Sequence, residues 1–120
     1  MRAIGVAMVK VKRAYEEPAA RDGYRVLVDR LWPRGVKKEK LALDDWAKEL
    51  APSDALRTWF AHDEAKFAEF AERYRAELKS DEAKAKLKEL RARAKKQTVT
   101  LVFGARDAEH NNAVVLARML

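Results

Sequence analysis

The sequence contains no cysteine. A disulfide framework, a thiol nucleophile and a zinc site built on cysteines are therefore excluded. Apolar residues never run for the roughly 20 positions that cross a bilayer. The first residues, MRAIGVAM, are not followed by a secretory cleavage signal. These absences favour a cytoplasmic protein with no membrane partner.

Glycine and proline are also scarce, with four and three copies in 120 residues. The glycines stand far apart, so the chain has no GxGxxG, GxxxxGK[ST] or GxSxG motif. It also lacks the HExxH spacing of helical zinc sites, and its histidines and aspartates are scattered. The familiar dinucleotide, P-loop and serine-hydrolase signatures are absent, and we expect no cofactor and no bound metal.

What the sequence does contain is charge. Charged residues make up 38% of the chain and hydrophobic residues 48%, a balance typical of a folded protein and not of a disordered one. The net charge is +7, and residues 1–40 hold eleven Lys and Arg against five Asp and Glu. A basic protein of this kind attracts anions in general, from phosphorylated metabolites to nucleic acids.

A chain of 120 residues has the size of one ordinary domain. We therefore expect residues 1–120 to form a single domain. The alternative is that residues 1–8 are an N-terminal extension to this domain, because Met8 could equally be the natural start.

Three segments have the composition of β-strands. Residues 9–15, VKVKRAY, alternate apolar and basic residues, as a strand with one wet face does. Residues 24–29, YRVLVD, and 98–103, TVTLVF, are richer in β-branched and apolar residues and predict buried strands. The link between the first two is too short for a helical crossover, so we expect them to be antiparallel or joined by an unusually short connection.

Helical spacing fills the region between the second and third strands. Asp44, Ser53, Asp63 and Ser80 each precede apolar residues at helical spacing and predict helix N-caps. The last helix is expected to begin near Asp107 and to run through AEHNNAVVLARML. Strands separated by helices predict an α/β fold with a small, mainly parallel sheet flanked by helices in a single three-layer-like domain.

Two of the strands end in chemically similar ways, one leading into DRLWPRG and the other into GARDAEHNN. In a parallel sheet, ligands bind beyond the carboxyl ends of the strands, where loops and helix N-termini converge. Guanidinium groups bind phosphate or carboxylate there through paired hydrogen bonds. The candidate ligand-binding residues at this edge are Arg30, Trp32, Arg34, Arg106, Asp107 and Asn111.

Both histidines lie in polar contexts beside loops, His62 in FAHDE and His110 in DAEHNN. Imidazole is the natural proton carrier near neutral pH, so both are candidate catalytic residues together with Asp29. Asp29, Asp63 or Asp107 could each orient or partner a histidine. Structural roles remain open alternatives. Asp107 could cap the last helix and bond His110 locally, Asp29 could pair with an arginine, and Trp32 could belong to the core.

Several of these segments together resemble a known family. The run DGYRVLVDRLWPRGVKKEKLALDDWAKELAPSDALRTWFAHD, then FAERYRAEL, then VTLVFGARDAEHNNAVVL is similar to the YeaO-like family, the short branch of bacterial domain-of-unknown-function 488. The resemblance covers nearly everything from about Lys12 to Leu120. It implies an α/β fold and a small bacterial or archaeal cytosolic protein, and it brings no biochemical activity with it.

The motif positions of this family coincide with the edge inferred from the strand ends. Longer relatives carry a cysteine-containing CxExxxxCHR segment where this chain has GARDAEHNN, so thiol chemistry does not carry over. In this chain the motif positions of the family are occupied by Asp29, Arg30, Trp32, Pro33, Arg34, Gly35, Trp59, His62, Asp63, Arg106, Asp107, His110 and Asn111.

Three functions follow as hypotheses. The first is a pocket for a small anion, such as phosphate or a nucleotide-like compound, with or without acid–base catalysis. The second is nucleic-acid binding by the basic N-terminal third, although no recognised nucleic-acid module is present. The third is a non-catalytic module that binds a partner. The oligomeric state does not follow from the sequence.

Overall fold

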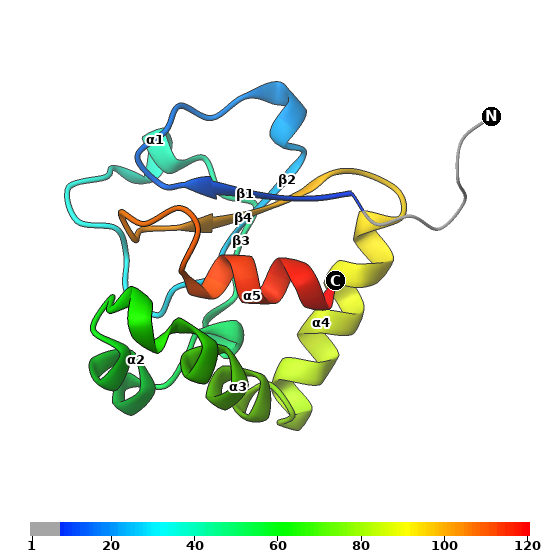
Figure 1. Cartoon of the computed structure of the whole chain (residues 1–120). Helices are drawn as coiled ribbons and strands as arrows, with labels where there is room; N and C mark the ends of the chain where they lie inside the picture. The colour runs from blue at the N-terminus through cyan, green and yellow to red at the C-terminus, as the bar shows by residue number, and fades with distance from the viewer. Residues whose placement is uncertain (1–7) are drawn as a thin grey trace.

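The computed structural model describes residues 8–120 and contains one four-stranded sheet with helices around it (Figure 1). The strands are β1 (Val9–Arg13), β2 (Tyr24–Leu27), β3 (Asp45–Trp46) and β4 (Val99–Phe103). The helices are α1 (Lys38–Leu41), α2 (Asp54–Phe60), α3 (Phe67–Glu77), α4 (Asp81–Ala94) and α5 (Asn112–Met119). Short 3-10 turns cover Ala20–Asp22, Lys48–Leu50 and Glu64–Lys66.

The sheet has the order β1-β4-β2-β3, and every neighbouring pair is parallel. The α/β class and the parallel sheet predicted from the sequence are therefore confirmed. The three predicted strands are present, each slightly shorter than expected. The two-residue strand β3 was not predicted, because a segment this short has no periodicity to read.

Of the two alternatives for the first two strands, the antiparallel arrangement was wrong and the unusually short connection is confirmed. β1 and β2 do not pair with each other, because β4 lies between them and is parallel to both. The chain returns from the end of β1 to the start of β2 through a loop and the Ala20–Asp22 turn, without a helical crossover. Gly23 ends this return with a φ of 63°, and a Cβ there would clash with the carbonyl oxygen of Thr98.

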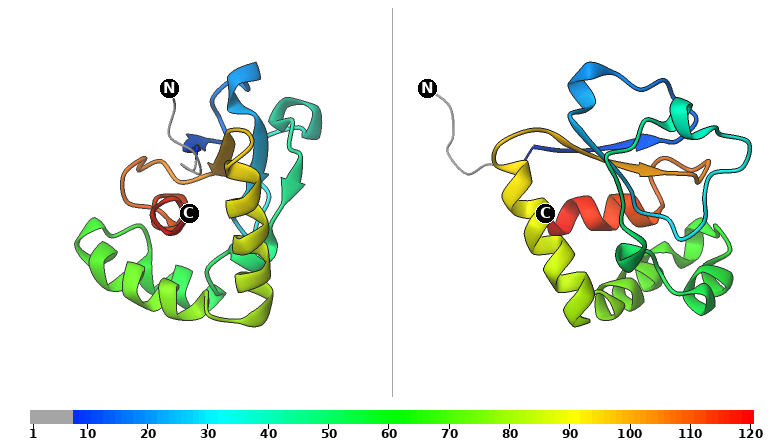
Figure 2. Two further views of the ribbon diagram at one scale, coloured as in Figure 1. Left: turned by 90° about the vertical axis from the view of Figure 1, so that its right-hand side faces the viewer. Right: turned by 180° about the vertical axis from the view of Figure 1, so that it is seen from behind.

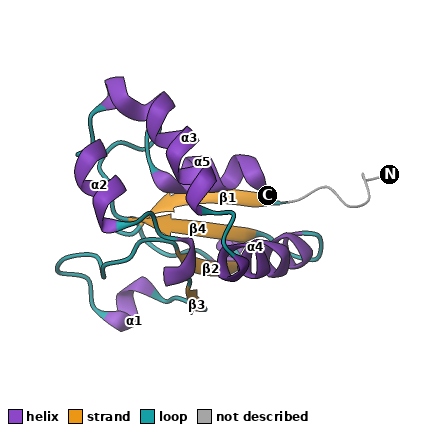
Figure 3. Ribbon diagram, turned by 90° about the horizontal axis from the view of Figure 1, so that it is seen from below, coloured by secondary structure: helices purple, strands orange, loops and turns teal. Residues whose placement is uncertain are grey.

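The two faces of the sheet are covered unequally (Figures 1 and 2). The helices α2 to α5 lie on one face, and α5 packs against β1 and β4 (Figure 3). The other face carries α1 and the loops around it. Successive side chains of β4 point to opposite faces of the sheet. Leu101 and Phe103 belong to the large core, and Val102 packs with Leu27 and Leu41 in a smaller core on the other face. The layer formed by α1 and its neighbouring loops is therefore thin compared with the layer of α2 to α5.

Three of the predicted helix caps are present. The side chains of Ser53, Asp63 and Ser80 accept hydrogen bonds from Leu56, Ala65 and Ala83 N–H groups, respectively. The prediction for Asp44 was wrong, because its carboxylate accepts the Arg25 N–H at 2.8 Å and the strand β3 follows it.

The last helix also begins later than predicted. It starts at Asn112, and Asn111 is its N-cap, with a side chain that accepts the Val114 N–H at 3.0 Å. Asp107 is therefore not the helix cap that the sequence suggested as its structural role.

A cluster of charges lies where the chain enters β2. Asp22 is fully buried and accepts hydrogen bonds from Arg25 at 2.7 Å, from Lys12 at 3.1 Å and from the Ala19 N–H at 2.9 Å. Arg25 is 4% exposed and also donates to the carbonyl of Leu41 at 2.7 Å. We call Asp22, Lys10, Lys12 and Arg25 the Asp22 cluster.

The described part of the chain contains no helix with the length and apolar character needed to cross a membrane. The suggested extension at residues 1–8 lies outside the described residues except for Met8, whose side chain is exposed.

Candidate functional site

Asp29 follows β2, and its carboxylate connects the carboxyl ends of β2 and β4 through a hydrogen bond. Its Oδ2 accepts a hydrogen bond from the Gly104 backbone N–H at 2.8 Å, and its Oδ1 accepts one from the Asn112 side-chain amide at 3.0 Å. Gly104 directly follows β4, and a Cβ there would stand 3.2 Å from the Asp29 carboxylate. Glycine therefore permits the close approach that brings the two strand ends together.

The environment of Asp29 disfavours its charge. Burial raises the pKa of its carboxyl group above the ordinary value. The hydrogen bonds from Asn112 and Gly104, and the charges of His62 and Arg57, act in the opposite direction without cancelling the effect of burial. Both groups that bond the carboxyl directly are neutral amides, and no cation of residues 8–120 forms an ion pair with it.

A cavity of about 640 Å³ opens beside Asp29 at the carboxyl ends of the parallel strands. Basic side chains line it from three segments, namely Arg34 after β2, Arg57 on α2 and Arg106 after β4. Arg57 pairs with Asp54 at 3.1 Å. Arg34 and Arg106 are exposed and form no ion pair with any residue in the range 8–120. Two guanidinium groups at the cavity thus remain available to an anion.

The remaining lining of the cavity is mostly apolar. It combines aromatic and aliphatic side chains with the two asparagines next to the start of α5. These residues are Tyr15, Leu31, Trp32, Pro33, Pro52, Phe60, Phe70, Ala105, Asn111 and Asn112. An apolar wall with a few polar groups is the usual composition of a small-molecule site.

His62 reaches the cavity through an unusual backbone conformation. Ala61 and His62 follow α2 with φ values of 47° and 57°, so two successive residues other than glycine are left-handed. Such a conformation costs on the order of 1 kcal/mol or more per residue and tends to occur at functional sites. His62 itself is exposed and lines the cavity.

The structure brings together part of the residue set predicted from the sequence. Asp29, Trp32, Arg34, His62, Arg106 and Asn111 all line the cavity. Three other candidates, Arg30, Asp107 and His110, do not line it. Arg30 instead faces Asp54 across a loose contact of 3.8 Å between two exposed side chains.

Asn111 and Asn112, at the start of α5, have different hydrogen-bond partners. Asn111 is buried, and its amide donates to the carbonyl of Asp107 at 2.9 Å while its oxygen caps the helix. Its polar atoms are therefore already engaged within the protein. Asn112 donates to both Asp29 and the carbonyl of Val28 at 3.0 Å. It is therefore Asn112, and not the predicted Asn111, that contacts the candidate catalytic residue Asp29.

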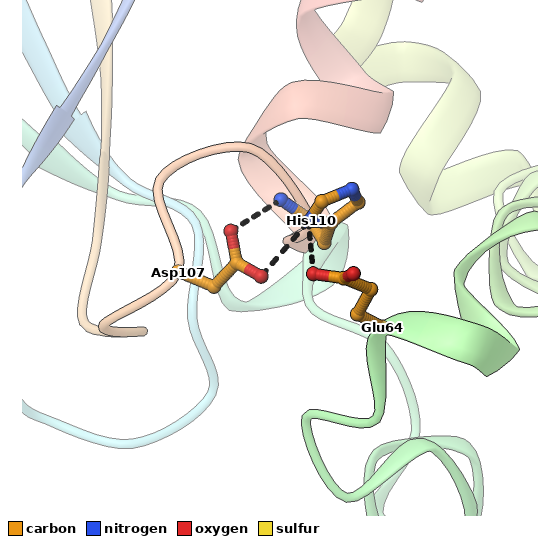
Figure 4. Close-up of side chains that lie close together, drawn as sticks. All are labelled: Glu64, Asp107 and His110. Atoms are coloured by element: carbon orange, nitrogen blue, oxygen red, sulfur yellow. Dashed lines mark hydrogen bonds and ion pairs between the residues drawn. The ribbon is translucent and has the colours of Figure 1, made fainter.

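Asp107 and His110 form a separate cluster with Glu64 (Figure 4). The His110 Nδ1 lies 2.8 Å from Asp107 Oδ2 and 3.6 Å from Glu64 Oε2. The hydrogen bond with Asp107 raises the pKa of His110, and the Glu109 N–H together with His110 lowers the pKa of Asp107. The imidazole also packs edge-on against Phe67, with ring centroids 5.2 Å apart.

This cluster is the one group of three or more His and acidic residues in 8–120 whose ligand atoms all lie within 4.8 Å of one another. Imidazole nitrogen and carboxylate oxygen are donor types that zinc binds. The hydrogen bond between His110 and Asp107 accounts for their proximity without an ion. The cluster joins the loop after β4 to the turn before α3, and it matches the local Asp107–His110 pairing suggested by the sequence.

Comparison with known proteins places the chain in a family. Residues 8–120 match the sequence model of a family described as "Inactive DUF488-N3 subclade". The chain belongs to this DUF488 subclade. Over 112 residues it is 47% identical to "Uncharacterized protein YeaO" of Escherichia coli (strain K12), covering 93% of this chain and 96% of that protein.

A mycobacterial relative supports the same family. "Uncharacterized protein Rv3073c" of Mycobacterium tuberculosis (strain ATCC 25618 / H37Rv) is 43% identical over 112 residues, which cover 93% of this chain and 92% of that protein. The YeaO-like resemblance drawn from the sequence is therefore confirmed. No solved structure matches the chain.

Several residues of the cavity in this DUF488 protein were missed from the sequence, among them Tyr15, Leu31, Arg57 and Asn112. Tyr15 follows β1, so a parallel first strand would have placed it at the same edge as Asp29. Asn112 stands beside the candidate Asn111, and the correct helix start would have separated their roles. Leu31 lies within DRLWPRG, but an apolar residue there carried no chemical signal. No sequence signal pointed to Arg57.

Proposed function

We propose that the cavity binds a small anion, such as phosphate or a nucleotide-like compound. The observation that carries this proposal is the pair Arg34 and Arg106, which line the cavity without an ion-pair partner in residues 8–120. Guanidinium groups bind phosphate and carboxylate with paired, charge-assisted hydrogen bonds. The position at the carboxyl ends of parallel strands supports the same function.

The family description favours binding over catalysis. The word "inactive" in it is said of the subclade, and we extend it to this chain as part of the proposal. Asp29 and His62 line the same cavity and would be the groups to move a proton if the protein were an enzyme. His110 lies outside the cavity and is paired with Asp107, so we assign it no part in binding.

The proposal is tested by isothermal titration of the full chain with inorganic phosphate. We expect binding that weakens about tenfold in Arg34→Gln and in Arg106→Gln, because each variant loses a charged hydrogen bond. Arg75→Gln is the matched control, since it removes the same charge from an exposed position of α3 outside the cavity. Absence of binding in the wild type, or equal weakening in all three variants, would contradict the proposal.

The nucleic-acid hypothesis is separated by titrating DNA and RNA at two ionic strengths. Binding through phosphate contacts falls steeply with salt. If nucleic acid binds and Arg34→Gln and Arg106→Gln change its affinity no more than Arg75→Gln does, then the basic surface and not the cavity is responsible.

A further inference from the structure

The mouth of the cavity exposes apolar side chains as well as cations. The large hydrophobic residues that stand exposed in the described chain are Met8, Tyr15 and Leu31, and the last two line the cavity. Tyr15 is 48% exposed and Leu31 is 60% exposed. Exposed apolar side chains gathered at a binding site indicate a ligand with an apolar surface of its own.

Tyr15 is held firmly although half of it is exposed. Its hydroxyl donates a hydrogen bond to the backbone carbonyl of Arg34 at 3.0 Å, and the Arg13 guanidinium lies over its ring, 5.1 Å from the centroid. Arg13 is itself fixed, because its Nε donates to the Ala105 carbonyl at 2.9 Å. The ring is therefore attached to the two loops that carry Arg34 and Arg106, so an aromatic surface and the two cations are parts of one assembly.

The size of the cavity agrees with a ligand larger than a simple anion. At about 640 Å³ it falls within the range of roughly 300–1,000 Å³ that is typical of sites for whole small molecules. Pro33, Phe60 and Phe70 extend the apolar lining beyond Tyr15 and Leu31. An inorganic phosphate ion on the arginines would leave this apolar wall without a contact.

We infer that the ligand is a phosphate ester that carries a planar ring, as a nucleoside monophosphate does. This inference rests on the proposed anion binding. The phosphate lies between Arg34 and Arg106, and the ring packs against Tyr15 and Leu31. Aromatic side chains that stack on a base strengthen binding by about tenfold or more.

The experiment compares ligands that differ only by the ring or only by the phosphate. The full chain is titrated with adenosine monophosphate, ribose 5-phosphate, adenosine and inorganic phosphate. We expect adenosine monophosphate to bind about tenfold tighter than ribose 5-phosphate. Equal affinity of these two would overturn the ring inference and leave anion binding intact. If no phosphate compound binds, or if adenosine binds as well as its monophosphate, the proposed function fails as well.

Two exposed positions supply the variants. Leu31→Ser and Tyr15→Ser are expected to weaken adenosine monophosphate about tenfold and to change ribose 5-phosphate affinity by no more than about threefold, the effect allowed for loss of the Tyr15 hydroxyl bond alone. Tyr15→Phe is the matched control, because it keeps the ring and removes only the hydroxyl bond to Arg34. It should retain adenosine monophosphate affinity within about threefold. Serine variants that weaken both ligands equally would contradict the assignment of the ring to this wall.

Discussion

Two regions of the molecule concentrate aspartate and arginine, and they differ in whether the charges are paired. In the Asp22 cluster, one buried carboxylate accepts hydrogen bonds from Lys12 and Arg25, and Arg25 also bonds the Leu41 carbonyl. In the cavity, Arg34 and Arg106 have no acidic partner within residues 8–120. Paired charges of the first kind stabilise the fold, whereas unpaired cations beside a cavity remain free to bind a ligand.

The two carboxyl groups differ in the same way. Burial opposes the charge of Asp22, but the Ala19 N–H, Lys12 and Arg25 outweigh it and hold its pKa at about 2. Asp29 is bonded by neutral amides, and burial raises its pKa. The same residue type therefore has a lowered pKa just before β2 and a raised pKa just after it.

The largest effect is expected from breaking the Asp22 cluster. Asp22→Asn leaves the buried guanidinium of Arg25 without its carboxylate, and loss of one partner of a buried pair costs about 3 kcal/mol or more. Urea unfolding measures the loss. Asp54→Asn is the control, because Asp54 is an exposed partner of Arg57 and should change the free energy of unfolding by about 0.5 kcal/mol at most. Equal effects of the two variants would contradict the structural role of the Asp22 cluster.

A somewhat smaller effect is expected in acid. The pKa of Asp22 is lowered from 3.8 to about 2 in the folded state, so its stabilisation is present above about pH 4 and is lost as the pH falls through about 2. The shift corresponds to about 2 kcal/mol. Urea unfolding between pH 2 and 5 should therefore show a steeper loss of stability in the wild type than in Asp22→Asn. Parallel pH profiles would show that Asp22 is not the group responsible.

The cavity arginines are expected to affect ligand-linked stability and little else. The double variant Arg34→Gln with Arg106→Gln should unfold within about 0.5 kcal/mol of the wild type, because both side chains are exposed. Phosphate at ten times its dissociation constant should stabilise the wild type by about 1.4 kcal/mol. Thermal unfolding should reveal no such stabilisation in the double variant. A strongly destabilised double variant would mean that these arginines are structural, as Arg25 is.

The smallest effect is expected from Asp29. Because its folded pKa is raised, its contribution to stability is present at low pH and is lost as the pH rises through the folded pKa. Asp29→Asn should therefore become more stable relative to the wild type as the pH rises, the opposite trend to Asp22→Asn. Urea unfolding of both variants between pH 3 and 8 measures the two trends. A trend of the same sign in both would remove the distinction between the two carboxyl groups.

The sequence predicted the parts of the fold that depend on local patterns. Alternating apolar and basic residues located β1, and apolar runs located β2 and β4. Ser53, Asp63 and Ser80 were predicted as caps correctly because a cap bonds an N–H group only two or three residues away. Strand order depends on contacts between distant segments, and no local pattern reveals that β4 enters between β1 and β2. Asp44 was misread for the same reason, since its partner is the distant N–H of Arg25.

The candidate site was likewise predicted where local patterns define it and missed where contacts between distant segments define it. Strand ends identified Asp29, Arg34 and Arg106 as neighbours, and all three line the cavity. Asp107 and His110 were placed with them because they follow the same strand end as Arg106, whereas the turn at Asp107 brings His110 to Asp107 and Glu64. The contribution of Tyr15 depended on the direction of β1, which the short first connection had obscured.

The most direct test of the contrast between paired and unpaired charges is a titration of the isotope-labelled chain with inorganic phosphate, followed by the backbone amide resonances. We expect the largest shifts at Arg34, Gly104, Ala105 and Arg106 around the cavity, and none beyond background at Lys12, Asp22 and Arg25. Shifts concentrated at the Asp22 cluster, or spread evenly over the exposed lysines of α4, would contradict the account.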